Sequence, residues 1–344
     1  MPKLNVSTRL SSVAIAMAAL CTLPVATHAQ AQAAPLAASQ SSYHRMLVGS
    51  VEVIALSDGT VPVPAAYLIS NSPNEVTRLL NKAFLPQTVD TSVNAYLIKT
   101  GGKRILVDAG TAELFGPSLN KLPAALARVG VTPDQITDIL VTHIHTDHTG
   151  GFMQGSNRAF PNAKVHLEKA ERDYWLSPAN KAAARADQKN FFDEAVLKFK
   201  PYDDAGQVVT FQGATQIFPG IKSQPAPGHT PGHSMYWLED GGEKLLFWGD
   251  VVHVGAVQFP NPTVTIVFDV DPDAARAQRK QAFADAALNG YMVAAPHLPF
   301  PGIGHVTRVA PPVGAFQGSD RLYKEIGEYR FYPMPYVNNA PYPN

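Results

Sequence analysis

The chain has 344 residues, of which 45% are apolar and 16% are charged, and 28 basic side chains balance 28 acidic ones. This apolar fraction supports a large packed core and excludes wholesale disorder, while a net charge of zero without any run of lysine or arginine argues against electrostatic binding of nucleic acid. The one cysteine, Cys21, can form neither an intramolecular disulfide nor a cysteine-rich metal site.

Residues 1–31 have the pattern of a cleavable signal peptide. Lys3 and Arg9 precede an apolar stretch of about 14 residues, which is too short for a permanent membrane span, and alanines follow at 29 and 31. A buried N-terminal helix is the alternative, but nothing amphipathic follows. We therefore expect a periplasmic or secreted protein without a stable membrane anchor.

Cleavage near residue 31 would also remove Cys21, so the mature chain would contain no thiol and could not use a cysteine nucleophile. Residues 32–42 are small and polar, which predicts a flexible lead-in segment. Residues 43–344 contain no repeat and no linker, and we expect one domain there.

Strands and helices are predicted to alternate along this domain. The helices are expected at 117–129, after residue 167 through Trp175, and at 271–288, where Asp271 can cap the first turn and Gly290 follows the last. Alternating or apolar runs predict strands at 51–56, 94–98, 104–107, 136–141, 165–167 and 292–295, with several more between 208 and 252. The pattern predicts an α/β protein whose sheets are covered by helices.

The strongest chemical signal is the run His-x-His-x-Asp-His at residues 143–148, directly after an apolar strand. His143 and His145 are two residues apart, so in an extended segment they point the same way. Asp147 and His148 follow after a turn and can face a second ion. Imidazole nitrogens and carboxylate oxygens suit zinc, and also manganese, cobalt or iron. Four potential ligands at this spacing outweigh the reading of ordinary surface or core side chains.

This motif resembles that of the metallo-β-lactamase superfamily, whose fold is an αββα sandwich of two mixed β-sheets flanked by helices. The family's other ligands have counterparts here: His229 in Pro-Gly-His-Thr-Pro-Gly-His, Asp250 at the end of Phe-Trp-Gly-Asp, and His297 after the last strand. Asp108 matches an aspartate that orients ligands in the family, and His233 is expected to support the site by hydrogen bonding.

The resemblance implies two divalent metal ions, most simply zinc. His143, His145 and His229 would hold one ion, Asp147, His148 and His297 the other, and Asp250 would bridge them. Asp147 and Asp250 would be the catalytic carboxylates, and a hydroxide bridging the metals would be the nucleophile. The resemblance also disfavours two other functions of the superfamily. Its β-lactamases generally lack the bridging carboxylate, and its oxidoreductases have a different set of ligands.

A closer resemblance, over nearly the whole chain, is to the methyl parathion hydrolase group of periplasmic enzymes. It is carried by runs such as 43–47, 55–60, 114–117, 256–259 and 300–305. It implies an aromatic pocket for the leaving group formed by Phe115, Trp175 and Phe192. His253 departs from the group, which has leucine there, and Ile266 is expected on the same wall.

These features predict a hydrolase of organophosphate triesters, aryl esters and lactones. The alternative is a dedicated lactonase, of the dihydrocoumarin or acyl-homoserine-lactone type, with side activity on phosphotriesters; a non-catalytic exported binding protein is a third. Because related enzymes are often dimers, a second copy of the chain is the one macromolecular partner expected. The remaining histidines of the domain receive other roles: His44 and His166 as strand or surface residues, and His305 as a hydrogen-bonding neighbour of the ligand loops.

Overall fold

The computed structural model describes residues 41–72, 74–309 and 328–335. The predicted signal peptide at 1–31 and nearly all of the predicted lead-in segment 32–42 lie outside the described residues. Both stay predictions, and so does export of the chain.

The first sheet contains seven strands in the order β1-β2-β4-β5-β6-β9-β10. Its first four strands are antiparallel and the rest parallel, so the sheet is mixed. The bounds are β1 (Tyr43–Val48), β2 (Val51–Pro64), β4 (Thr88–Thr100), β5 (Lys103–Val107), β6 (Asp138–Leu140), β9 (Lys164–Glu168) and β10 (Val208–Phe211).

The second sheet also has seven strands, in the order β11-β12-β13-β14-β16-β17-β18. Only β14 and β16 pair in parallel; the other neighbours are antiparallel. The bounds are β11 (Gln216–Phe218), β12 (Ile221–Pro225), β13 (Ser234–Asp240), β14 (Glu243–Phe247), β16 (Met292–Ala294), β17 (Ile303–Arg308) and β18 (Tyr329–Pro333). Two short pairs complete the strands: β3 (Leu68–Ile69) with β15 (Thr265–Ile266), and β7 (Met153–Gln154) with β8 (Asn157–Arg158).

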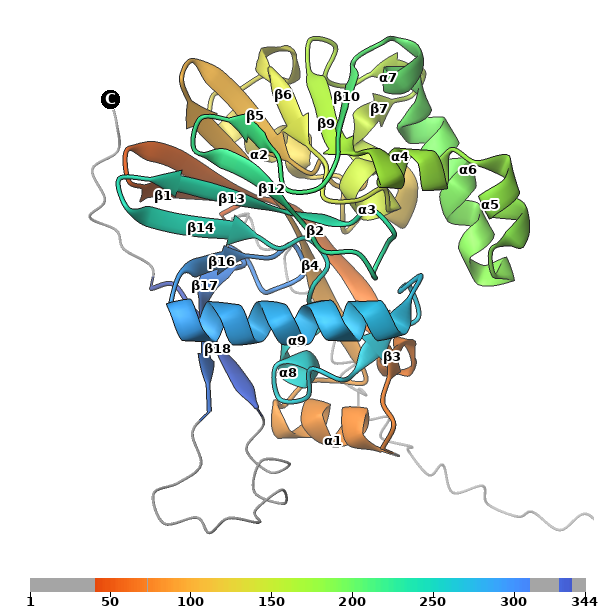
Figure 1. The fold of residues 1–344 in the computed structure, drawn as a ribbon, viewed down its shortest axis with the longest axis vertical. Helices are drawn as coiled ribbons and strands as arrows, with labels where there is room; N and C mark the ends of the chain where they lie inside the picture. The colour runs from red at the N-terminus through yellow and green to blue at the C-terminus, as the bar shows by residue number, and fades with distance from the viewer. Residues whose placement is uncertain (1–40, 73, 310–327, 336–344) are drawn as a thin grey trace, which may run out of the picture. The chain divides into compact units, whose positions relative to one another are not determined.

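The two sheets pack face to face and helices cover their outer faces (Figure 1). Neighbouring residues of a strand point to opposite faces, so Ile98 packs between the sheets while Leu97 packs toward the outer helices. On the far side, Phe283 of α9 (Pro272–Asn289) packs against the second sheet. This arrangement confirms the predicted αββα sandwich.

The remaining helices are α1 (Glu75–Lys82), α2 (Leu122–Arg128), α3 (Thr146–Thr149), α4 (Lys169–Trp175), α5 (Pro178–Ala183), α6 (Lys189–Lys198), α7 (Lys200–Asp204) and α8 (Gly255–Gln258). In the described part of the chain, none of the helices is both long and apolar enough to cross a bilayer. The helix predicted at 271–288 is α9, and Asp271 caps it by accepting from the backbone N–H groups of Asp273 and Ala274.

The helix predicted at 117–129 begins later than expected, at Leu122. Its first turn is capped from a distant strand: the buried carboxylate of Asp58, in β2, accepts the backbone N–H groups of Lys121 and Leu122 at 2.8 Å. A cap supplied from more than sixty residues away leaves no local signal, which is why periodicity alone placed the start too early.

Candidate metal centre

The candidate ligands follow the ends of strands from both sheets. Residues 143–148 come after β6, His229 after β12, Asp250 after β14 and His297 after β16. Close packing of the backbone holds the first loop in place, because a Cβ on Gly151 would lie 1.9 Å from the Ala109 carbonyl oxygen after β5. The loop can approach that strand only with glycine at this position.

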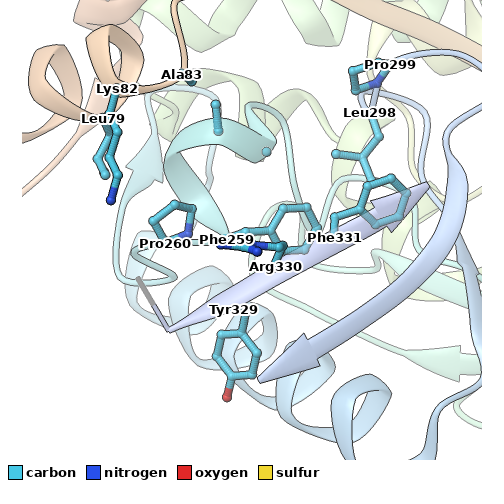
Figure 2. Close-up of a pocket in the computed structure, with 12 residues that line it drawn as sticks. Leu79, Lys82, Ala83, Phe259, Pro260, Leu298, Pro299, Tyr329, Arg330 and Phe331 are labelled. Atoms are coloured by element: carbon cyan, nitrogen blue, oxygen red, sulfur yellow. The ribbon is translucent and has the colours of Figure 1, made fainter. Parts of the chain in front are cut away.

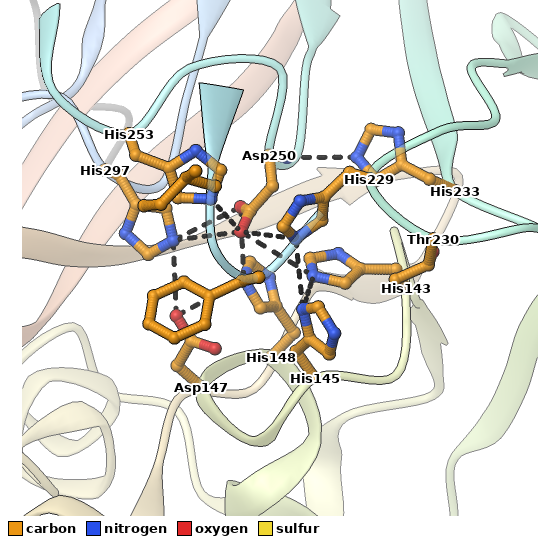
Figure 3. A network of polar contacts seen from close by, with 12 residues as sticks. His143, His145, Asp147, His148, His229, Thr230, His233, Asp250, His253 and His297 are labelled. Carbon is orange, nitrogen blue, oxygen red and sulfur yellow. Dashed lines mark hydrogen bonds and ion pairs between the residues drawn. The ribbon is translucent and has the colours of Figure 1, made fainter. Parts of the chain in front are cut away.

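Three imidazole nitrogens of the first group point at one another (Figure 3). The Nδ1 atom of His145 lies 3.1 Å from Nε2 of His143 and 3.0 Å from Nε2 of His229. Asp250 completes the group, with Oδ2 at 3.2 Å from Nε2 of His229 and 3.6 Å from Nε2 of His143. All four side chains are buried.

The second group shares Asp250 with the first. Its Oδ1 atom lies 3.2 Å from Nε2 of both His148 and His297. Asp147 approaches His297 from the other side, with Oδ2 at 3.2 Å from Nε2. The ligand atoms within each group all lie within 4.8 Å of one another. The structure thus brings all seven sequence-predicted ligands into two adjoining groups that meet at one carboxylate.

The tautomers of three histidines follow from their outer partners. The Nδ1 atoms of His148, His229 and His297 lie 2.8 Å, 2.7 Å and 2.8 Å from Asp108 Oδ2, Asp269 Oδ1 and the Ser92 carbonyl oxygen, respectively. A carbonyl and an ionised carboxylate can only accept, so each Nδ1 carries a proton, and in the neutral ring that binds a metal each Nε2 would present a lone pair inward.

The donor set fits divalent metal ions. Ring nitrogens of His143, His145 and His229 converge to about 3 Å, an arrangement that a cation held between them would satisfy. Nε2 of His148 and Oδ1 of Asp250 are buried and have no hydrogen-bond partner among the described residues. Nitrogen and oxygen donors of this kind suit zinc and similar ions.

The electrostatics of the site differ between the ligands. Although burial opposes the charge, the carboxylates around them raise the pKa of His148, that of His229 to about 9 and that of His297 to about 10, so metal binding would release a proton from each of these three rings. Burial lowers the pKa of His143 and His145 well below the usual value, and neighbouring imidazoles lower it further, so both rings are neutral at pH 7. Burial opposes ionisation of Asp250, but the surrounding imidazoles outweigh it and hold its pKa well below the usual range. Neutral imidazoles and an ionised carboxylate are the forms that ligate.

Asp108 and His233 support the ligands without facing the centre of either group. Asp108 accepts from the backbone N–H and the hydroxyl of Thr142, each at 2.8 Å, as well as from His148. His233 donates from Nδ1 to the Ala226 carbonyl at 3.1 Å and accepts the backbone N–H of Asp250 at 3.0 Å on Nε2. Both ring nitrogens of His233 are therefore occupied.

Two further carboxylates hold the site, and sequence reasoning missed both. Asp269 orients His229, as described above. Glu171, fully buried in α4, accepts the backbone N–H groups of Ile144 and Gly232 at 2.8 Å and so ties the first ligand loop to the second. The available signal was weak: Asp269 is a single acid between Phe268 and Val270, and Glu171 lies in the charged run 169–173, which is typical of a solvated helix face.

A cavity of about 460 Å³ opens above the two groups. Phe115 and His253 line it, as predicted for the substrate pocket, together with Tyr67, Phe191 and Phe268. The ring of His253 stacks on that of His297, with centroids 5.2 Å apart, and its Nε2 lies 3.1 Å from Asp250 Oδ2.

Three predicted pocket residues do not line this cavity. Trp175 and Phe192 are 1% and 2% exposed and pack on each other in the core behind it, with ring centroids 4.7 Å apart. Successive residues of a helix point about 100° apart, so it is Phe191 of α6, rather than Phe192, that reaches the cavity. Ile266 pairs with Leu68 and is buried in a separate cluster with α1.

The other histidines lie away from the ligands. His44 is in β1, and His166 in β9 contacts Asp138, with Nε2 2.9 Å from Oδ1. The expectation that His305 supports a ligand loop was wrong: it is exposed on β17 and donates to the Gly290 carbonyl at the end of α9.

Comparison with known proteins identifies a family. The model of the metallo-beta-lactamase superfamily matches residues 88–297. A beta-lactamase-like protein 2 homolog of Caenorhabditis elegans is 32% identical over 185 residues, which cover 54% of this chain and 52% of that protein. An N-acyl homoserine lactonase of Bacillus thuringiensis is 26% identical over 189 residues, which cover 48% of this chain and 67% of that protein. The chain thus spans about half the length of the first of these relatives.

Solved structures match over more of the chain. A crystal structure described as hydrolase AbOPH in the beta lactamase superfamily has a TM-score of 0.79 and 32% identity, over 88% of this chain and 100% of its own. AidC, described as a dizinc quorum-quenching lactonase in complex with a product, has a TM-score of 0.73 and 25% identity, over 87% of this chain and 99% of its own. Together with the two ligand groups, these matches indicate two divalent metals.

Proposed function

Because this chain belongs to the metallo-β-lactamase superfamily and is a metal-dependent hydrolase, we propose that it opens lactones and cleaves aryl esters at a two-metal centre. The observation that carries the proposal is the pair of ligand groups sharing Asp250 at the base of the 460 Å³ cavity. Cavities of this size accommodate small organic molecules.

We assign zinc to both groups, since neutral imidazoles and carboxylates are typical zinc ligands. When bound, the two ions would polarise a carbonyl or phosphoryl oxygen and activate water at neutral pH. The protein's own part is to hold the ligands: Asp108 and Asp269 orient His148 and His229, and His233 holds the backbone of Asp250.

His253 places lactones ahead of phosphotriesters in this proposal, which reverses the order expected from the sequence. Its Nε2 atom already contacts Asp250, whereas Nδ1 is buried and has no hydrogen-bond partner in the described part of the chain, so a polar atom of the substrate would satisfy Nδ1. A lactone supplies an oxygen for this purpose, whereas the apolar arm of a phosphotriester would leave the imidazole unsatisfied. The lactonases among the relatives are consistent with this choice.

Organophosphate triesters are the second candidate, because the rest of the cavity suits an aryl leaving group. Phe115, Phe191 and Phe268 all line it. Aromatic faces of this kind can stack on a nitrophenyl or a bicyclic leaving group. The same two-metal centre could serve both substrate classes, with the shape of the cavity deciding between them.

A kinetic panel on zinc-loaded protein tests the proposal. Dihydrocoumarin, N-hexanoyl homoserine lactone, phenyl acetate, paraoxon and methyl parathion would be compared by kcat/KM, with Asp250→Ala as the matched control for contaminating activity. We expect the lactones to lead. A higher kcat/KM for the phosphotriesters would reverse the ranking, and no hydrolysis above the control for any substrate would refute the proposal.

A further inference from the structure

A second cavity, of about 480 Å³, has the lining drawn in Figure 2. It is enclosed by α1, α8, the segment after His297 and β18, and it shares no lining residue with the cavity above the metals. Its twelve lining residues are Leu79, Lys82, Ala83, Gly255, Ala256, Phe259, Pro260, Leu298, Pro299, Tyr329, Arg330 and Phe331.

The walls of this cavity are apolar and well supported. Phe331 of β18 stacks on Phe259 with ring centroids 5.6 Å apart and an interplanar angle of 8°, and Phe259 stacks in turn on Phe283 of α9 at 4.6 Å. Leu79 and Leu298 complete the apolar lining. Stacked rings backed by a long helix form a preformed surface, so a ligand would lose little free energy in ordering it.

The charged residues that line the cavity are all basic. Lys82 and Arg330 are cationic, and none of the twelve residues is acidic. The guanidinium of Arg330 makes no hydrogen bond or ion pair with any described residue. An apolar wall beside the guanidinium of Arg330 is complementary to a molecule with a hydrocarbon body and one carboxylate, which a guanidinium can bind through two parallel hydrogen bonds.

We propose that this cavity is a binding site for a medium-chain acyl carboxylate, separate from the hydrolytic centre. The carboxylate would pair with Arg330, and the acyl chain would lie against Phe259, Leu298 and Phe331. The occupant would also touch the segments that carry two residues of the metal cavity, because Gly255 follows His253 by two positions and Leu298 directly follows His297.

A photoreactive analogue of octanoate, with an alkyl diazirine in its chain, tests the site on the zinc-loaded full-length protein. After irradiation, peptide mass spectrometry should place the label on the segments with Phe259 and Phe331, and unlabelled octanoate should compete while octanol should not. Label confined to segments of the metal cavity, such as the one with Phe191 and Phe268, would overturn the proposal. Equal competition by octanol would overturn the carboxylate assignment.

Variants separate the site from non-specific labelling. Lys82→Gln combined with Arg330→Gln should reduce labelling at least tenfold, whereas Arg308→Gln, on the neighbouring strand and outside the cavity, should not. Ala256→Phe, which fills the cavity without changing charge, should also abolish labelling, and the thermal transition of each variant checks folding. Because these residues lie outside the metal cavity, kcat/KM for dihydrocoumarin should stay within twofold. Unchanged labelling in a folded charge variant or in folded Ala256→Phe would show that no acyl carboxylate site exists here. So would competition by octanoate that is seen only for a dimeric fraction from gel filtration.

Discussion

Among the described residues, Asp250 is the candidate ligand that belongs to both groups. Its carboxylate oxygens lie 3.2–3.6 Å from ring nitrogens of both ligand groups, so one side chain links the two. Removing it takes a donor from both groups at once and leaves the inward-facing imidazoles without their shared anion.

Asp250→Ala should therefore lose both metals and nearly all activity together. Metal content measured after gel filtration, beside kcat on dihydrocoumarin, checks this expectation. Asp273→Ala is the control, because that carboxylate is 89% exposed on α9. Two retained metals per chain with near-normal turnover would contradict the bridging assignment.

His253 contributes to the wall of the cavity without being counted among the ligands. Replacing it by leucine removes a polar group and adds an apolar contact, which favours the alkoxy arms of a phosphotriester. His253→Leu should shift the ratio of kcat/KM for methyl parathion over dihydrocoumarin upward by roughly 10- to 200-fold. His305→Leu, at an exposed histidine on β17, should leave the ratio unchanged. Loss of a metal in His253→Leu would show instead that His253 is a ligand.

Asp269 acts on the centre through His229 alone. In Asp269→Asn the side chain keeps its shape but loses the charge that fixes the His229 tautomer at 2.7 Å. Metal affinity should fall about 10- to 100-fold, measured by competition with a chromophoric chelator. Circular dichroism would show that the fold is retained. An unchanged metal affinity would mean that His229 does not depend on this partner.

At the scale of elements, a buried carboxylate joins three strands of the first sheet. Asp138 begins β6 and contacts Lys103 of β5 at 2.8 Å and His166 of β9 at 2.9 Å. Burial would raise the pKa of Asp138, but these two partners outweigh it and lower the pKa below the usual value of 3.8. The stabilisation is therefore present above pH 3.8 and is lost as the pH falls through the lowered pKa of the folded state.

Asp138→Asn should lower the free energy of unfolding at pH 7 by about 1.5–3 kcal/mol, the range for hydrogen bonds to charged groups. The difference from the unmodified chain should shrink as the pH falls below 3.8. Urea unfolding at pH 7, 5 and 3 measures it. Asp134→Asn, on an exposed turn, is the control. A difference in unfolding free energy that grows in acid would contradict the expected direction of the pH dependence.

At the scale of the whole molecule, the metal centre connects the two sheets. The loop at 143–148 follows a strand of the first sheet, whereas His229, Asp250 and His297 follow strands of the second. Ions bound here would hold the halves of the sandwich together. Binding that is restricted to the folded state stabilises it by about 2.7 kcal/mol at a free metal concentration of 100 times Kd.

Chelation should therefore lower the thermal transition by several degrees as well as abolish activity, and added zinc should restore both. Calorimetry with and without chelator checks this. Iodoacetamide is the matched control: if residues 1–31 are removed on export, as we propose, no cysteine remains for it to modify. A transition that does not move on complete metal removal would contradict the structural role of the centre.

The sequence alone determined the chemistry of the site and the class of the fold. His143, His145, Asp147 and His148 are neighbours in the chain, so their convergence is local, and His229, Asp250 and His297 each stand in short runs that the family resemblance located. The order of apolar runs and turns predicted an α/β protein whose sheets are covered by helices, because burial of one face constrains the period of each element, and the family resemblance implied the αββα sandwich.

Only the tertiary structure decided the details that depend on contacts between distant segments. One such detail is that Phe191, rather than Phe192, lines the metal cavity. Others are the contact of Asp269 with His229, the contacts of Glu171 with both ligand loops, and the cavity between α1, α8 and β18. A residue's period along a helix or strand shows which side faces the core, but not which distant side chain meets it there. That depends on how the sheets and helices pack, and packing is a property of the whole chain.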